Sequence, residues 1–349
     1  MQSDTTTLSN PRGWLRGAGF DGGLIFGVAL LAFASGAVVE ARPHLFPIVL
    51  VLDLWILGYQ HVVSTFTRLA FDRESFGEHR FLVVWLPFIV LAGAVSLVLV
   101  FGGWILSTTY LYWQWFHYTR QSYGIERVYR RKAGSAVVGD ERLTRWVLYL
   151  VPLWGILYRS YQAPEAFLGV ELKVLPVPRE LVWVVGVVAA AVASRWLLQV
   201  AWASLRGATI QGHSLYLLSH TAIFVVGYVA IESLDHGWLV VNVWHNAQYI
   251  LFVWMFNQNR FQGGVDPKRR LLSHLSQPGN GIYYFLTCLG ISTVAYFGIE
   301  TVFGAMESYS ALPLFLVAYQ TINFHHYIVD GLIWKVRKKP LRQTLGIDS

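Results

Sequence analysis

Long apolar segments recur along almost the whole chain, and they constrain the fold more than any other feature of the sequence. A helix needs about 20 mostly apolar residues to cross the hydrocarbon core of a bilayer. The segments that meet this requirement are 22–41, 45–67, 80–102, 104–124, 144–163, 180–204, 212–232, 238–258, 281–303 and 310–335. Only 13% of the residues are charged, whereas a soluble domain has about 25%. The sequence therefore predicts an all-α fold, a polytopic transmembrane helix bundle of about ten spans.

Basic residues indicate how these spans are oriented. Cytoplasmic loops of membrane proteins carry an excess of lysine and arginine. Here these residues flank the first and last spans and fill every second connection, while the alternate connections are poor in charge. This pattern places both termini in the cytoplasm. It divides the chain into a polar N-terminal tail (1–20), a single transmembrane helical domain (21–335) and a basic C-terminal tail (336–349).

The same pattern predicts where the protein resides and which partners it lacks. We expect a multi-pass integral membrane protein, in the inner (cytoplasmic) membrane if the host is a bacterium. The formal net charge of +7 is a topology signal under this interpretation, because the basic residues lie between apolar segments. No nucleic-acid partner is therefore expected.

Polar side chains concentrate on the even-numbered spans. Ionisable residues inside a bilayer are costly, usually face the bundle interior and mark function. At helical spacing they form stripes on four spans: His61, Thr65 and Arg68; Tyr110, Gln114, His117 and Gln121; Asn242, His245, Asn246 and Tyr249; and Asn323, His326, Tyr327, Asp330 and Trp334. A rise of about 1.5 Å per residue puts their histidines, and His220 on the seventh span, between the cytoplasmic surface and the midplane.

A shared depth for several histidines predicts a metal centre, since neutral imidazole is the commonest metal ligand. The predicted ligands are His61, His117, His245 and His326, with Asp330 as a fifth ligand or an orienting group. His326 and Asp330 are one helical turn apart, whereas His325 is rotated by about 100° from its neighbour. His325 and His220 are therefore reserve ligands. The one cysteine, Cys288, excludes a thiolate-rich site.

Further side chains on these spans have predicted supporting roles. Tyr249 and Tyr327 are candidates for donating protons or lining a substrate site, and Arg120 is a candidate for binding an anionic head group. Asparagine and glutamine side chains are expected to orient the ligands by hydrogen bonds. The histidines near span ends or in loops, which are His44, His79, His213, His236 and His274, are expected to be solvated.

Three short stretches resemble motifs of a known membrane family. HHYIVD, YQHVVST and FHYTRQSYG are similar to the histidine motifs of the Brp/Blh family of membrane β-carotene dioxygenases. The resemblance implies a helical bundle with an iron centre. It also implies that His61, His117, His245 and one of His325 or His326 are ligands. The family's His–Gly-containing signature is absent here, and this chain has more predicted spans.

These observations predict a metal-dependent oxidoreductase or oxygenase. Its expected substrate is lipophilic, either isoprenoid or fatty-acyl, and enters from the bilayer. The expected cofactor is iron, mono- or dinuclear, with copper or zinc as alternatives. Membrane lipids and an electron-donor protein are the expected partners.

Two other interpretations stay open. VWHNAQY resembles the Trp–His motif of membrane-bound O-acyltransferases, in which His245 would be the catalytic base with help from Asn242 or Asn246. A proton-coupled transporter would instead use the histidines and Asp330 as a proton relay across the midplane.

Overall fold

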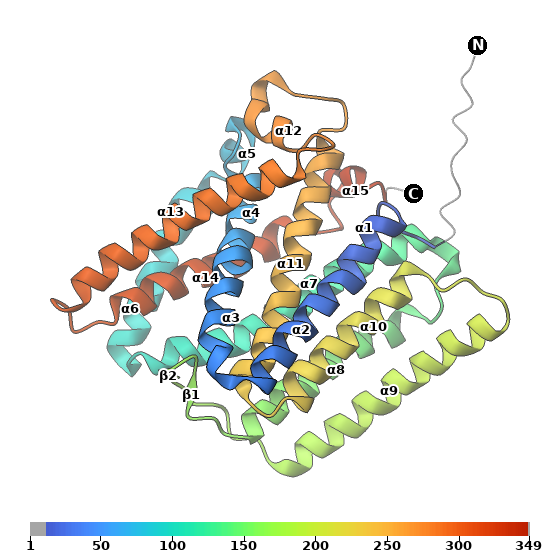
Figure 1. The fold of residues 1–349 in the computed structure, drawn as a ribbon, viewed down its shortest axis with the longest axis horizontal. Coiled ribbons are helices and arrows are strands. Elements are labelled where there is room, and N and C mark those ends of the chain that lie inside the picture. Colours follow the sequence, from blue (N-terminus) through green and yellow to red (C-terminus); the bar gives the residue numbers. More distant parts are fainter. Residues whose placement is uncertain (1–11, 348–349) are drawn as a thin grey trace.

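The computed structural model describes residues 12–347, which are almost entirely helical. Its long helices lie side by side in one slanted bundle (Figure 1). The α-helices are α1 (Ala18–Gly22), α2 (Val28–Ala41), α3 (Phe46–Asp53), α4 (Tyr59–Leu69), α5 (Arg73–Glu78), α6 (Leu86–Phe101), α7 (Trp104–Ala133), α8 (Glu141–Tyr161), α9 (Arg179–Leu205), α10 (Gly212–Val225), α11 (Leu234–Arg260), α12 (Arg270–Leu275), α13 (Gly281–Glu307), α14 (Leu314–Ile333) and α15 (Lys339–Leu345).

Short π and 3-10 turns extend several of these helices. They are η1 (Gly23–Gly27), η2 (Pro43–Leu45), η3 (Leu54–Gly58), η4 (Phe81–Trp85), η5 (Gly134–Ala136), η6 (Val226–Ala230) and η7 (Pro267–Arg269). The strands β1 (Ala166–Phe167) and β2 (Val170–Glu171) pair antiparallel in the connection between α8 and α9. Because η1 and η3 continue the helical path, α1 with α2 and α3 with α4 each act as one long rod.

Six helical stretches within the described residues are long and apolar enough to cross a membrane. They are Ala18–Ala41, Pro43–Leu69, Phe81–Phe101, Arg179–Leu205, Gly212–Ala230 and Gly281–Glu307. They indicate an integral membrane protein. The remaining long helices, α7, α8, α11 and α14, coincide with predicted spans but are more polar. A total of about ten spans and cytoplasmic termini stay predictions.

Apolar side chains on the bundle exterior fit a lipid environment. Helix α9 lies at the edge of the bundle beside α8 (Figure 1). It exposes large apolar side chains, including Trp183, Leu198 and Trp202. Its inner face has the small Gly186, where an added Cβ would lie 2.6 Å from the indole nitrogen of Trp154. Glycine therefore allows α9 to approach α8 closely, while the outer face suits contact with acyl chains.

Helix α11 crosses the centre of the bundle and is buried on every side (Figure 1). A helix without an exposed face belongs in a core. It packs against α2, α4 and the turn η6. Because α11 carries Asn242, His245 and Tyr249, its central position places these polar groups deep inside the protein.

A buried arginine organises the entry to α11. The Arg159 side chain is fully buried and donates to the carbonyl oxygens of Gly227 (2.9 Å), Ile231 (2.6 Å) and Glu232 (2.7 Å). These carbonyls lie where η6 ends and the chain turns into α11, so they lack helical partners. Close backbone contact accompanies this arrangement, since a Cβ on Gly237 would lie 1.9 Å from the Gly227 oxygen.

A second polar cluster joins the connection after α4 to the end of α11. Asp72 caps α5 by accepting from the Ser75 backbone N–H (2.9 Å) and hydroxyl (2.9 Å). Arg260 and Arg269 lie 3.3 and 3.5 Å from its carboxylate. Burial raises the pKa of Asp72, but the Ser75 hydrogen bonds and the two guanidinium charges outweigh it and hold the pKa below its usual value of 3.8.

We expect this cluster to stabilise the connection only while Asp72 is ionised. A depressed carboxyl pKa gives stability that is full above the unfolded value and is lost as pH falls through the folded pKa. Asp72→Asn should therefore weaken hydrogen-exchange protection of residues 70–78, by about 1 kcal/mol at neutral pH. The difference between the variant and the unaltered chain should shrink only below the ordinary carboxyl range. A difference that titrates near neutral pH would contradict this assignment.

Both chain ends contain more structure than the predicted tails imply. The buried Asp21 carboxylate accepts from the backbone N–H groups of Leu15 (2.9 Å) and Gly17 (2.9 Å), which ties the end of the predicted N-terminal tail to α1. Residues 1–11 lie outside the described part of the chain. In the predicted basic tail after 335, α15 forms and buries Leu341 and Leu345 in the main core.

Candidate metal centre

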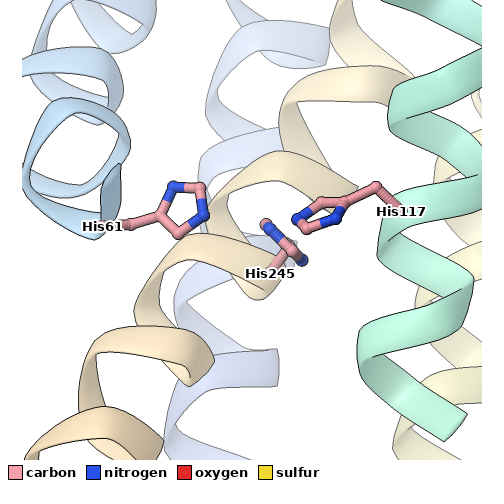
Figure 2. A group of neighbouring side chains, drawn as sticks. All are labelled: His61, His117 and His245. Atoms are coloured by element: carbon pink, nitrogen blue, oxygen red, sulfur yellow. The ribbon is translucent and has the colours of Figure 1, made fainter. Parts of the chain in front are cut away.

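Four imidazoles from four different helices meet inside the bundle. They are His61 on α4, His117 on α7, His245 on α11 and His326 on α14. Figure 2 shows three of these rings converging on one space. The His61 ring centre lies 5.0 Å from that of His245 and 4.3 Å from that of His326, and the His117 ring centre lies 5.0 and 5.1 Å from the same two.

The nitrogens that face this space have no hydrogen-bond partner within the described residues. This holds for Nε2 of His61, His117 and His326 and for both ring nitrogens of His245. Buried polar atoms are nearly always satisfied, since leaving one unpaired is costly. Ligand nitrogens of His61, His117 and His245 all lie within 4.8 Å of one another. Such a set of lone pairs fits a shared cation, so these side chains could hold a metal ion.

Asp330 extends the cluster by one carboxylate. Its Oδ2 lies 3.6 Å from His326 Nε2 and 3.9 Å from His117 Nε2. His117, His326 and Asp330 form a second group able to hold a metal. Because His117 belongs to both groups, the five side chains make one continuous donor set of nitrogen and oxygen atoms.

Hydrogen bonds fix the orientation of two of these rings. His61 Nδ1 lies 3.2 Å from the carbonyl oxygen of Gly58, at the end of η3, and His326 Nδ1 lies 3.1 Å from Thr65 Oγ1. Metal-bound histidines normally donate their second N–H to such oxygens. A carbonyl and a threonine thus serve here, rather than the amide side chains that the sequence suggested. Gln121 does support the site indirectly, because it donates to the carbonyl oxygen of His245 (3.2 Å).

Thr65 links three members of the centre. Its hydroxyl lies 3.1 Å from His326 Nδ1, 3.3 Å from Asp330 Oδ1 and 2.7 Å from the Tyr249 hydroxyl. Tyr249 in turn donates to Asp330 Oδ1 (2.7 Å) and accepts from the Trp334 indole N–H (2.9 Å). One carboxylate oxygen is therefore held by hydroxyl groups, and the other faces the imidazoles.

We expect Thr65→Val to lower metal affinity about 10–100-fold, because it keeps the side-chain shape but removes these hydrogen bonds. Metal content after dialysis against graded chelator measures the effect. Thr67→Val is the matched control. Thr67 is also buried on α4, but its hydroxyl bonds to the Ser64 carbonyl oxygen (2.7 Å) and contacts no ligand. Equal affinity in all three proteins would show that Thr65 does not orient the site.

Two predicted reserve ligands are not brought to the cluster. His325 points away from it, with Nε2 2.7 Å from the Leu82 carbonyl oxygen and its ring stacked on Phe66 at 5.8 Å. This follows from its rotation around α14 relative to His326. His220 lies on α10, where Nε2 is 3.2 Å from the Leu148 carbonyl oxygen. Neither belongs to a potential metal-binding group within the described residues.

One histidine expected to be solvated is instead buried. His213, at the start of α10, has no exposed surface, and its Nε2 lies 2.7 Å from the buried carboxylate of Glu126. Arg130 donates to the same carboxylate (3.0 Å). The expectation for His213 was wrong because α7 runs far enough past the predicted end of its span to cover it.

The three predicted supporting residues all lie on one cavity beside the cluster. The cavity has a volume of about 560 Å³ and is lined by Arg120, Tyr249 and Tyr327, together with His117 and Asp330. Tyr327 stacks on His117, with ring centres 4.4 Å apart. Arg120 donates to the Tyr149 hydroxyl (2.8 Å). The cavity gives a second molecule access to the donor set.

A buried polar network adjoins the cluster at His245, and the sequence did not predict its connections. Asn242 donates to Asp53 (2.5 Å) and accepts from the Tyr118 hydroxyl. Gln114 contacts Tyr118 and accepts from the Trp238 indole (2.6 Å). The Tyr118 ring lies 4.1 Å from that of His245. Tyr118 and Trp238 went unnoticed because they resemble ordinary packing residues.

Similarity to known proteins does not identify the site. No family model, no curated protein and no solved structure matches the chain.

Proposed function

We propose that the protein is an integral-membrane metal-dependent oxidoreductase or oxygenase that acts on a lipophilic substrate. One observation carries this proposal: the unpaired nitrogens of four buried histidines converge beside Asp330, and two members of this donor set, His117 and Asp330, line a cavity. A purely structural histidine cluster would pair these nitrogens with hydroxyl or carbonyl groups. A donor set that opens on a cavity supports a reactive centre, since a catalytic metal needs a position for its substrate.

The chemistry of the donor set supports iron as the metal. Imidazole and carboxylate ligands without thiolate suit iron, copper or zinc, and the resemblance of HHYIVD to the Brp/Blh dioxygenases favours iron. A ferrous ion bound by these side chains would supply redox chemistry with dioxygen. The protein contributes the dry surroundings, because His61, His117, His245, His326 and Asp330 are all buried.

Tyr249 and Asp330 are the groups best placed to handle a proton. The tyrosine hydroxyl donates to the carboxylate, and both side chains line the cavity. Arg68 stabilises this arrangement through Trp334, because its guanidinium lies over the Trp334 ring at 4.4 Å. Trp334 donates to the Tyr249 hydroxyl. We infer that Arg68 positions the tyrosine rather than binding substrate.

The acyltransferase alternative fits the site less well. It requires one catalytic base, His245, assisted by Asn242 or Asn246. Asn242 instead bonds to Asp53 and Tyr118. The alternative also gives no role to three further imidazoles around the same space.

The transporter alternative has one observation in its favour. From His61 the buried polar groups continue to Asp53, about 12 Å further along the same helical rod. This path would suit a proton relay. It would equally supply protons to a redox centre, and it does not account for the unpaired nitrogens.

Elemental analysis of the purified protein, followed by dioxygen uptake, tests the proposal. We expect about one or two iron ions per chain after anaerobic loading with ferrous iron. Nitric oxide should then give a ferrous-nitrosyl spectrum, and dioxygen should be consumed when membrane lipid extract is added. Protein that binds no redox metal, or that binds iron but never reacts with dioxygen, would overturn the assignment.

A further inference from the structure

The cavity beside the metal centre has two chemically different ends. His117, Tyr249 and Asp330 lie at the inner end. Five cations also line the cavity: Arg120, Arg127, Arg131, Lys335 and Arg337. Arg127 and Arg131 follow His117 on α7 by about 15 and 21 Å along the helix axis, at 1.5 Å per residue. The cavity therefore leads from the ligands to a basic mouth at the end of α7.

One face of α7 forms much of this path. His117, Arg120, Gly124, Arg127 and Arg131 are spaced by three or four residues, so they share a face of the helix. Lys335 and Arg337 come from the segment that follows α14. Helix α7 and the segment directly after α14 thus present basic side chains at the mouth.

The positive charge at the mouth is mostly uncompensated. Arg127 forms an ion pair with Glu141 (2.8 Å). Among residues 12–347, the ion pairs do not include Arg131, Lys335 or Arg337. Five cations on the cavity wall face one carboxylate, Asp330, which belongs to the metal centre. Guanidinium groups recognise carboxylate and phosphate by paired hydrogen bonds, so the mouth suits an anion.

Between the two ends the cavity is apolar. Trp113, Phe116 and Phe252 line it, and α15 closes one side with Leu341 and Leu345. Its volume of about 560 Å³ falls within the roughly 300–1,000 Å³ of typical ligand sites.

Two glycines keep the cavity open. A Cβ added to Gly124 or Gly331 would meet nothing within 4 Å, and both residues line the cavity. Glycine is unfavourable inside an α-helix by about 1 kcal/mol relative to alanine. Its presence on the cavity face of α7 and α14 preserves width where any larger side chain would narrow the path.

We propose that the cavity binds an anionic amphiphile, with a carboxylate or phosphate head group at the basic mouth and its apolar chain extending to the histidine cluster. This proposal rests on the proposed function where it treats the ligand as the substrate, and it names that substrate's class. The head group lies beside Arg127 and Arg131, so the position that reaches His117 is far along the apolar chain. A neutral hydrocarbon would leave the basic mouth without a partner.

Equilibrium binding of radiolabelled palmitate and hexadecanol tests the charge requirement. The protein is placed in phosphatidylcholine nanodiscs, with and without ferrous iron. We expect palmitate to bind at least about tenfold more tightly than hexadecanol. Arg131→Glu combined with Arg337→Glu should remove that preference. Arg73→Glu combined with Arg206→Glu, which changes the same charge at residues that do not line the cavity, should leave it intact.

A second variant tests whether binding occurs inside the cavity. Gly124→Phe should reduce palmitate binding by at least about tenfold while leaving metal content unchanged. Gly290→Phe is its control, since Gly290 on α13 also has open space around it but does not line the cavity. Equal binding of palmitate and hexadecanol, or undiminished palmitate binding in Gly124→Phe, would overturn the proposal.

A competition experiment distinguishes the source of the head group. Phosphatidic acid added to the nanodiscs displaces palmitate if a membrane phospholipid is the natural occupant, and fails to do so if the occupant is a free acid. Both results support an anionic head group. Binding requires no turnover. If iron-free protein binds palmitate more tightly than hexadecanol, the inference of an anionic ligand therefore stands even when the oxygenase assignment fails. Dioxygen uptake with neutral lipids alone would contradict the anionic ligand and leave the oxygenase assignment intact.

Discussion

Protein carrying His326→Ala is expected to lose its bound metal almost completely. His326 shares the donor space with His61, His117 and Asp330, and its second nitrogen lies against Thr65. Loss of an outer hydrogen bond to a metal-bound histidine typically lowers affinity about 10–100-fold, so loss of the ligand itself should exceed about 100-fold. Elemental analysis after dialysis, together with a competitive chelator titration, measures the change.

The adjacent histidine provides the control for this experiment. His325→Ala changes the same residue type one position away, but His325 contacts the Leu82 carbonyl oxygen and Phe66 instead of the cluster. Metal content should stay near that of the unaltered chain, with at most a modest loss of stability. If both variants kept their metal, or if His325→Ala lost it while His326→Ala did not, the donor set would be wrong.

Arg159→Met is expected to cause the largest loss of stability. Methionine fills similar space, but it leaves the carbonyl oxygens of Gly227, Ile231 and Glu232 without the donor that now reaches all three. Each buried, unsatisfied polar group costs about 1–3 kcal/mol. The free energy of unfolding should therefore fall by about 3 kcal/mol or more. Thermal unfolding in detergent micelles, followed by tryptophan fluorescence, measures this fall.

An exposed arginine on the same helix serves for comparison. Arg145 is 52% exposed and pairs with Glu141 on the surface of α8. Exposed ion pairs contribute less than about 1 kcal/mol, so Arg145→Met should barely shift the transition. Similar small shifts in both variants would show that water or a backbone rearrangement satisfies the three carbonyls. Metal content below the transition should be unchanged in either case, because Arg159 touches no proposed ligand.

The positions of the helices could be predicted from the sequence because length and hydropathy decide them locally. The structure has a long helix at each predicted span, and the convergence of four histidines follows from depth and helical phase. His61, His117, His245 and His326 were assigned a common depth by counting residues, and the structure brings them together. Phase also separates His326 from His325, because adjacent residues on a helix point in directions about 100° apart.

Contacts between distant helices could not be predicted in this way. Thr65 appears in the sequence as one more hydroxyl on a polar stripe, and only the packing of α4 against α14 puts it beside His326 and Asp330. His213 appears to lie in a loop until α7 covers it. The cavity likewise depends on α15, a helix formed within a segment whose basic residues suggested only a tail.

The order of the donor residues along the chain sets a limit on when the site can be assembled. His61, His117, His245 and His326 come from helices that are far apart in sequence, and His326 follows His245 by 81 residues. During synthesis the earlier helices are therefore made while their imidazoles still lack the last partner. A complete donor set exists only after α14 has packed beside α4. A metal ion held by all of these side chains could therefore be acquired only once α14, the last helix of the set, is in place.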